Sequence, residues 1–102
     1  MAVAFVWEFP LSEGETQTRN YDAIAADVGG FAPEGMIVHT AGFDPDRGVF
    51  RIFDVWESRE AGDRFMNDVL MPIVERVTAE ADPETLVDPT AETWYELHDL
   101  LR

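Results

Sequence analysis

The order of hydrophobic patterns along the chain is the feature that most restricts how it can fold. Four segments have the aromatic and β-branched content typical of strands, at residues 2–9, 36–43, 49–57 and 93–101. Two segments place apolar residues at helical spacing, the first at Tyr21, Ile24, Ala25 and Val28 and the second at Ala61, Phe65, Val69, Ile73 and Val77. The resulting β-α-β-β-α-β order predicts an α+β fold of the ferredoxin-like class, a four-stranded antiparallel sheet with both helices on one face.

Local signals predict where these elements begin and end. The hydroxyl of Thr16 or Thr18 can cap the first helix, and that of Ser58 can cap the second. The sequence Asp-Pro-Asp-Arg-Gly at residues 44–48 predicts a hairpin turn between the second and third strands. Because Pro72 has no amide hydrogen, we expect either a kink there or a fresh helical segment with Pro72 in its first turn.

The third strand also predicts how the chain assembles. Its apolar side chains are Phe50, Ile52 and Trp56 on one face and Val49, Phe53 and Val55 on the other. Both helices cover the same face of the sheet, so the other face needs cover from elsewhere. The length of 102 residues predicts a single domain spanning 1–102, which buries only about 60–65% of its extended surface. We therefore expect a homodimer with the two sheets face to face.

Composition excludes several classes of function. With 21 acidic and 7 basic residues, the net charge of −14 disfavours nucleic acids and anionic membranes as partners. Every basic residue is arginine and there is no cysteine, which excludes lysine Schiff bases, thiol nucleophiles and cysteine-bound metals. Phosphate-loop and dinucleotide-binding motifs are absent from the sequence, and we expect no cofactor and no metal. Residues 1–8 lack the basic flank of a signal peptide, so we expect a cytoplasmic protein.

A histidine and an aspartate are the candidate catalytic pair. If the hairpin pairs Phe43 with Phe50, the alternation of side chains places His39 opposite Asp54, with Cβ atoms about 4.5–5.5 Å apart. The carboxylate would then orient the imidazole and raise its pKa, which suits a general base near neutral pH. Two structural alternatives remain open. A one-residue slip would put the two side chains on opposite faces, and a histidine on an edge strand can simply be solvated.

The segment Phe50-Arg51-Ile52-Phe53-Asp54-Val55-Trp56-Glu57-Ser58-Arg59-Glu60-Ala61 resembles the strand-to-helix signature of the dimeric α+β-barrel superfamily. Within that superfamily it is most similar to antibiotic-biosynthesis-monooxygenase-like proteins, with an apolar-x-apolar-x-acid-x-Trp pattern and a capped helix after it. The resemblance implies a pocket for a flat aromatic molecule between sheet and helices. Phe65 stands where these families often have a histidine, which argues against haem ligation, and Asp54 stands where Glu is commoner.

Two functions follow as hypotheses. The first is a cofactor-independent, monooxygenase-like enzyme acting on an aromatic or polyketide-like molecule, in which His39 and Asp54 handle a proton. The residues expected to line its pocket are Trp56, Trp7, Ile37 and Phe65, with Ile37 opposite Trp56 in the hairpin. The alternative is a non-catalytic homodimer that binds a small ligand or has a structural role, with the aromatic side chains forming its core. The pair Glu96 and His98 shares a face of the expected fourth strand but is too small a ligand set for a metal site.

Overall fold

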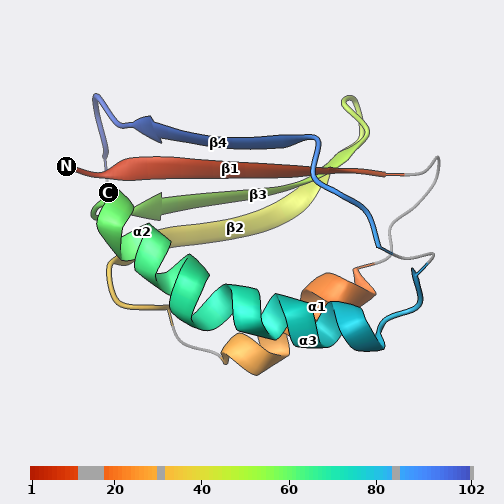
Figure 1. The fold of residues 1–102 in the computed structure, drawn as a ribbon. Coiled ribbons are helices and arrows are strands. Elements are labelled where there is room, and N and C mark those ends of the chain that lie inside the picture. The colour runs from red at the N-terminus through yellow and green to blue at the C-terminus, as the bar shows by residue number, and fades with distance from the viewer. Residues whose placement is uncertain (12–17, 30–31, 84–85, 102) are drawn as a thin grey trace.

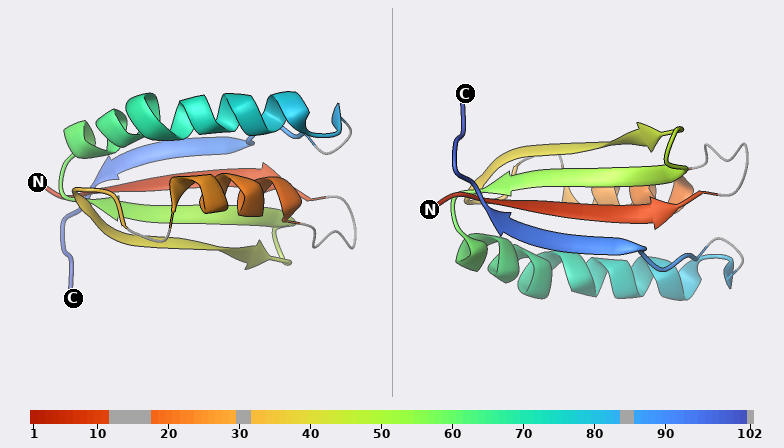
Figure 2. Two further views of the ribbon diagram at one scale, coloured as in Figure 1. Left: turned by 90° about the horizontal axis from the view of Figure 1, so that it is seen from below. Right: turned by 90° about the horizontal axis from the view of Figure 1, so that it is seen from above.

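The computed structural model describes residues 1–11, 18–29, 32–83 and 86–101. Its elements, in chain order, are β1 (Val3–Pro10), α1 (Arg19–Val28), β2 (Met36–Asp44), β3 (Val49–Trp56), α2 (Arg59–Phe65), the π-helix η1 (Met66–Leu70), α3 (Met71–Glu80) and β4 (Ala91–Glu96) (Figure 1). The strands form one antiparallel sheet in the order β2-β3-β1-β4. All the helices lie on the same face of that sheet (Figure 2). The predicted ferredoxin-like α+β arrangement is therefore confirmed.

The fourth strand differs from its predicted bounds of 93–101. β4 starts earlier, at Ala91, and ends at Glu96, which pairs with the first residue of β1, Val3. Beyond Glu96, one further backbone hydrogen bond joins the Leu97 amide to the Ala2 carbonyl at 3.0 Å. β4 ends at Glu96 because its antiparallel partner β1 begins opposite it, at Val3. Sequence alternation alone could not reveal this. The predicted placement of His98 in the strand is therefore wrong.

The second helical region is a continuous run of α2, η1 and α3. It begins as predicted, because the Ala61 amide donates a hydrogen bond to the Ser58 hydroxyl at 3.1 Å. The π-helix ends two residues before Pro72, and the Met71 amide donates to the Met66 carbonyl five residues back. Widening the helix there avoids the clash between a proline ring and the carbonyl four residues earlier. α3 then restarts with Pro72 in its first turn, which is the second of the two predicted outcomes.

The start of α1 departs from the predicted capping. Thr18 occupies the N-cap position, but its hydroxyl donates to the Asp22 carboxylate at 2.8 Å and makes no hydrogen bond to a free amide of the first turn. The alternative cap, Thr16, lies outside the described residues.

The layer between sheet and helices is tightly packed only beneath α2. Val3, Phe5 and Trp56 are buried there, and the buried Gly62 of α2 lies against the indole rings. A Cβ atom on Gly62 would come within 2.6 Å of the Trp94 ring. By contrast, α1 and α3 contain no buried residue. The two ends of this layer therefore differ, and α1 and α3 lie over the less tightly packed one.

The opposite face of the sheet carries no helix (Figure 2). Val6 and Phe53 are half-buried on it, while Val38 and Tyr95 keep 40% and 46% of their surface exposed. At one end of this face Arg51 makes ion pairs with Glu8 at 2.6 Å and Asp44 at 3.0 Å. In the described part of the chain, no helix is long and apolar enough to cross a membrane.

Candidate functional site

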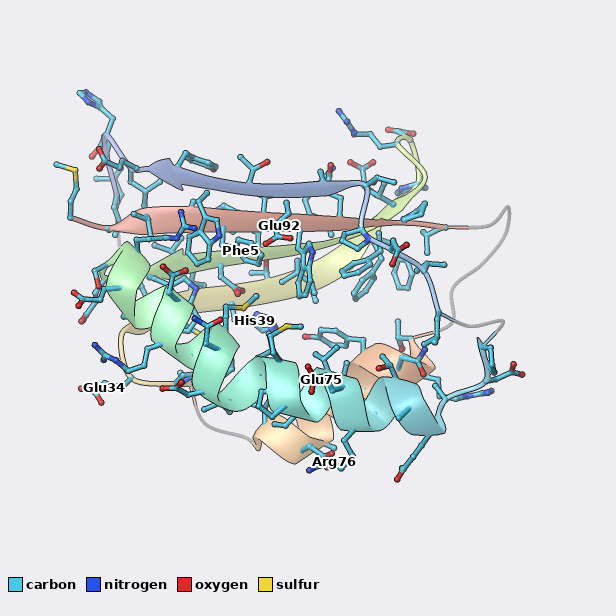
Figure 3. The ribbon with its side chains drawn as sticks, viewed as in Figure 1. Phe5, Glu34, His39, Glu75, Arg76 and Glu92 are labelled. Atoms are coloured by element: carbon cyan, nitrogen blue, oxygen red, sulfur yellow. The ribbon has the colours of Figure 1, made fainter. Side chains whose placement is uncertain are left out.

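A cavity of about 1010 Å³ lies between the sheet and the helices. Its walls are mainly apolar, with Trp7, Phe50 and Ile52 contributed by the sheet and Ile24, Leu70 and Val74 by the helices. Small-molecule sites commonly occupy about 300–1,000 Å³ and combine apolar walls with a few polar groups. The polar groups here include His39, Asp54 and Tyr21. In Figure 3 the His39 side chain projects from the sheet toward the helical layer, as does Phe5.

The β2–β3 hairpin brings His39 and Asp54 together. Phe43 pairs with Phe50 and His39 pairs with Asp54, so the predicted register is confirmed here and the one-residue slip is wrong. The His39 Nδ1 atom lies 2.5 Å from the Asp54 Oδ1 atom. The Asp54 side chain is 10% exposed and that of His39 is 37% exposed, so the carboxylate is the buried end of the pair.

The register changes farther along the hairpin, at Ile37. Met36 pairs with Trp56 and Val38 with Val55, which leaves Ile37 as an extra residue in β2. The predicted pairing of Ile37 with Trp56 is therefore wrong. The end of the hairpin is held by the Glu57 amide, which donates to the Gly35 carbonyl at 2.7 Å, and a bulge accommodates the extra residue between this contact and Val38.

Tyr21 extends the pair into a chain of three residues. Its hydroxyl lies 2.7 Å from the His39 Nε2 atom, and the two rings are nearly parallel, at 7°. The Tyr21 ring also meets Phe50 edge to face, with ring centroids 5.3 Å apart. Sequence reasoning assigned Tyr21 to the apolar stripe of the first helix and missed its polar role. The available signal was a tyrosine among aliphatic residues, because a buried tyrosine hydroxyl usually finds a hydrogen-bond partner.

The electrostatics of this chain favour a neutral tyrosine next to a basic imidazole. The hydrogen bond to Asp54 raises the pKa of His39 and outweighs the opposing effect of burial. Burial raises the pKa of Tyr21, and the carboxylates of Asp54 and Asp22 raise it further. An ionised carboxylate can only accept, so His39 donates its Nδ1 hydrogen to Asp54. In the neutral imidazole, Nε2 then accepts the hydrogen of the Tyr21 hydroxyl.

The other predicted pocket residues fall into two groups. Trp7, Ile37 and Phe65 line the cavity. Trp56 is not among the described lining residues. It is 1% exposed, and its ring centroid lies 5.5 Å from that of Phe65, so it supports the cavity wall from behind. Across the described residues, no group of three or more acidic, histidine or cysteine side chains is placed to hold a metal ion.

Comparison with known proteins gives the fold. No protein-family model matches this chain, and no curated protein matches it. Among solved structures, Rv0793 from Mycobacterium tuberculosis superposes with a TM-score of 0.69 at 21% identity, covering 100% of both chains. SnoaB, a cofactor-independent oxygenase from Streptomyces nogalater, gives a TM-score of 0.66 at 17% identity, covering 98% of this chain and 96% of SnoaB.

A third similar structure is a Chloroflexus aurantiacus J-10-fl protein described as a candidate antibiotic biosynthesis monooxygenase. It gives a TM-score of 0.66 at 15% identity and covers 100% of this chain and 98% of its own. At identities this low, the similarity shows that the folds are alike. The resemblance predicted from residues 50–61 is confirmed at the level of the fold. The chain thus has the α+β fold of antibiotic biosynthesis monooxygenase-like proteins.

Proposed function

We propose that this protein is a cofactor-independent, monooxygenase-like enzyme acting on an uncharged aromatic or polyketide-like molecule. The observation that supports this most is the hydrogen-bonded chain Tyr21–His39–Asp54 at the wall of a large apolar cavity. The buried carboxylate holds the imidazole in one orientation, and the raised pKa of His39 suits a base that works near neutral pH. Trp7, Ile37 and Phe65 would contact the flat faces of the ligand.

The proposed reaction needs a base and molecular oxygen. Removal of a proton from a methylene group beside an aromatic ketone gives an electron-rich enolate, which reacts with oxygen directly. The methylene carbon loses two hydrogens and gains one oxygen atom as a carbonyl, and the second oxygen atom leaves as water. The protein's part is to take the first proton and to exclude bulk water from the carbanion.

The charges around the cavity support an uncharged ligand. None of the described residues that line the cavity is Arg or Lys, whereas two acidic residues, Asp54 and Asp88, line it. Of the residues that the structure does not describe, 12–17, 30–31 and 84–85 contain no Arg or Lys, and the remaining one is the C-terminal Arg102. A carboxylate or phosphate on the ligand would therefore enter an apolar, acidic site that offers it no cationic partner among the described lining residues, at a large desolvation penalty.

The test is thermal unfolding against uncharged quinols, anthrones and hydroxyflavones, each paired with a carboxylated analogue. A ligand at 100 times its dissociation constant stabilises the folded protein by about 2.7 kcal/mol. We expect shifts with uncharged compounds and none with their anionic partners, and oxygen consumption that His39→Gln abolishes. Binding without oxygen consumption would support the non-catalytic, ligand-binding alternative. No shift with any compound would contradict both of these functions and favour a structural role for the homodimer.

The partner we propose is a second copy of this chain, docked on the helix-free face of the sheet. Val6, Phe53 and Val38 give that face an apolar, partly exposed centre. Sedimentation at micromolar concentration should give twice the 11.5 kDa chain mass, and Val6→Arg should give the single-chain mass with the helix content unchanged. A wild-type protein of single-chain mass would contradict the dimer. The single-domain organisation and the cytoplasmic location stay predictions.

A further inference from the structure

Both nitrogen atoms of His39 already have hydrogen-bond partners in the structure. Nδ1 contacts the Asp54 carboxylate at 2.5 Å, and Nε2 contacts the Tyr21 hydroxyl at 2.7 Å. A ligand in the cavity could reach the imidazole directly only by displacing one of them. Asp54 is a buried carboxylate and would lose its partner, which makes its displacement costly. The route to the imidazole therefore passes through Tyr21.

We propose that Tyr21 is the residue that meets the acidic proton of the ligand and relays it to His39. This inference rests on the proposed function, because it requires a ligand with an acidic hydrogen in the cavity. It assigns the contact with the ligand to Tyr21 and makes His39 the final acceptor. Tyr21 is then the catalytic residue, and Asp54 is a positioning residue that acts through the imidazole.

The geometry of Tyr21 suits a relay. A phenol oxygen that donates its hydrogen to Nε2 keeps lone pairs that can accept a second hydrogen. Tyr21 lines the cavity and is fixed by the edge-to-face contact with Phe50 and the nearly parallel ring of His39. The ionisable groups around it are Asp22 on its own helix and Asp54 on β3. Burial and these two carboxylates disfavour a tyrosinate, so Tyr21 passes the proton on without holding a negative charge.

The proton movement balances as follows. The O–H or C–H bond of the ligand breaks and its proton joins the Tyr21 oxygen, while the original Tyr21 proton moves to His39 Nε2. The ligand becomes an anion, and the imidazole becomes an imidazolium beside the Asp54 carboxylate. Tyr21 is neutral before and after the transfer, and no oxidant or reductant is needed for this step.

The test measures ionisation of a bound reporter and requires no turnover. 7-Hydroxycoumarin is uncharged and planar, and its neutral and anionic forms have different absorption spectra. We compare the wild type with Tyr21→Phe, and use Tyr95→Phe as the matched control. Tyr95 is the only other tyrosine in the chain and lies on the opposite face of the sheet. His39→Gln removes the final acceptor.

We expect the anion-to-neutral ratio of the bound reporter at pH 7 to be about tenfold lower in Tyr21→Phe than in the wild type, a change of one unit in its apparent pKa. His39→Gln should lower the ratio equally, and Tyr95→Phe should match the wild type. An unchanged or higher ratio in Tyr21→Phe would overturn the relay, because the ligand would then meet His39 directly while the proposed base remained intact.

Failure of the proposed function gives a different result. If the reporter shows no rise in fluorescence anisotropy with the wild type, the ligand class is wrong and the relay falls with it. If Tyr21→Phe does not fold, the wild type labelled with 3-fluorotyrosine supplies the test, since it has two fluorine signals that Tyr95→Phe assigns. Reporter binding must shift the Tyr21 signal and leave that of Tyr95 in place. A bound reporter that leaves the Tyr21 signal unmoved overturns the relay.

Discussion

The layer between the sheet and the helices is packed at one end and hollow at the other. Beneath α2, Trp56 is 1% exposed and Gly62 has no room for a side chain. Beneath α1 and α3, neither of which has a buried residue, the layer opens into a cavity of about 1010 Å³. The helices over the hollow end are tied to each other by the Arg76–Asp27 ion pair at 2.6 Å.

From this difference we expect stability and the proposed function to depend on different ends of the fold. The packed end holds the sheet and α2 together through dense apolar contacts, which dominate the free energy of folding. The hollow end leaves apolar surface and the hydrogen-bonded residues Tyr21, His39 and Asp54 available to a ligand. Each prediction below tests whether the two ends have these separate roles.

Truncation of a large side chain should have the largest effect, and only at the packed end. Trp56→Ala removes a fully buried indole and should lower the free energy of unfolding by about 3–5 kcal/mol. Ile24→Ala, at the wall of the cavity, should lower it by only about 1 kcal/mol, because Ile24 already borders open space. Urea unfolding measures both, and equal losses would remove the distinction between the two ends.

Overfilling should have the next largest effect. Gly62→Ala places a methyl group 2.6 Å from the Trp94 ring and 3.3 Å from that of Trp56. Trp94 is held by Phe5 on one side and by the Arg59 guanidinium at 4.2 Å, so it has little freedom to move away. The expected loss in the free energy of unfolding is about 1–3 kcal/mol.

Gly42→Ala is the matched control for this substitution, since an added Cβ atom at Gly42 meets nothing within 4 Å. It should change the free energy of unfolding, measured with urea, by no more than about 0.5 kcal/mol. A Gly62→Ala protein as stable as the wild type would show that the layer beneath α2 is looser than its contacts imply.

The smallest expected effect is a pH dependence that comes from the hollow end. The folded pKa of His39 is raised, mainly by the hydrogen bond to Asp54. Its protonation therefore stabilises the fold below the unfolded pKa of about 6.5, and this contribution disappears as pH rises through the folded value. His39→Gln should be less stable than the wild type near pH 5.5, with a proton-linked part of less than about 1 kcal/mol because the pair is partly exposed, and the deficit should shrink as pH rises through the folded pKa of His39.

His98→Gln is the control for this pH dependence, because the second histidine lies beyond β4 and away from the cavity. Thermal unfolding at both pH values measures the deficits. A His39→Gln deficit that is constant with pH, or one that grows as pH rises, would contradict the assigned ion pair.

Much of the fold followed from sequence because its signals are local and periodic. The hairpin turn at residues 44–48 and the alternation in β2 and β3 set the register that pairs His39 with Asp54. The bulge at Ile37 did not follow, because it depends on where Gly35 meets the end of β3. The early end of β4 likewise depends on the length of β1, which is a tertiary property.

The site followed only in part, for a related reason. Periodicity assigned Tyr21 to a face of a helix, but could not tell that its hydroxyl would meet His39, on a strand 18 residues later. Trp56 was expected to contact the ligand because it is aromatic and shares a face of the sheet with Asp54. The structure buries it at the packed end, since α2 begins directly after β3 and covers it.

The account centres on a ligand in the cavity that transfers a proton to His39. Nitrogen-15 NMR of the imidazole side chains tests this most directly, because the chain has only two histidines and His98→Gln assigns them. At a pH where His39 is neutral in the free protein, addition of 7-hydroxycoumarin should convert His39 to the imidazolium and leave His98 unchanged. If the compound binds and His39 stays neutral, the proton does not reach the imidazole, and the central claim is wrong.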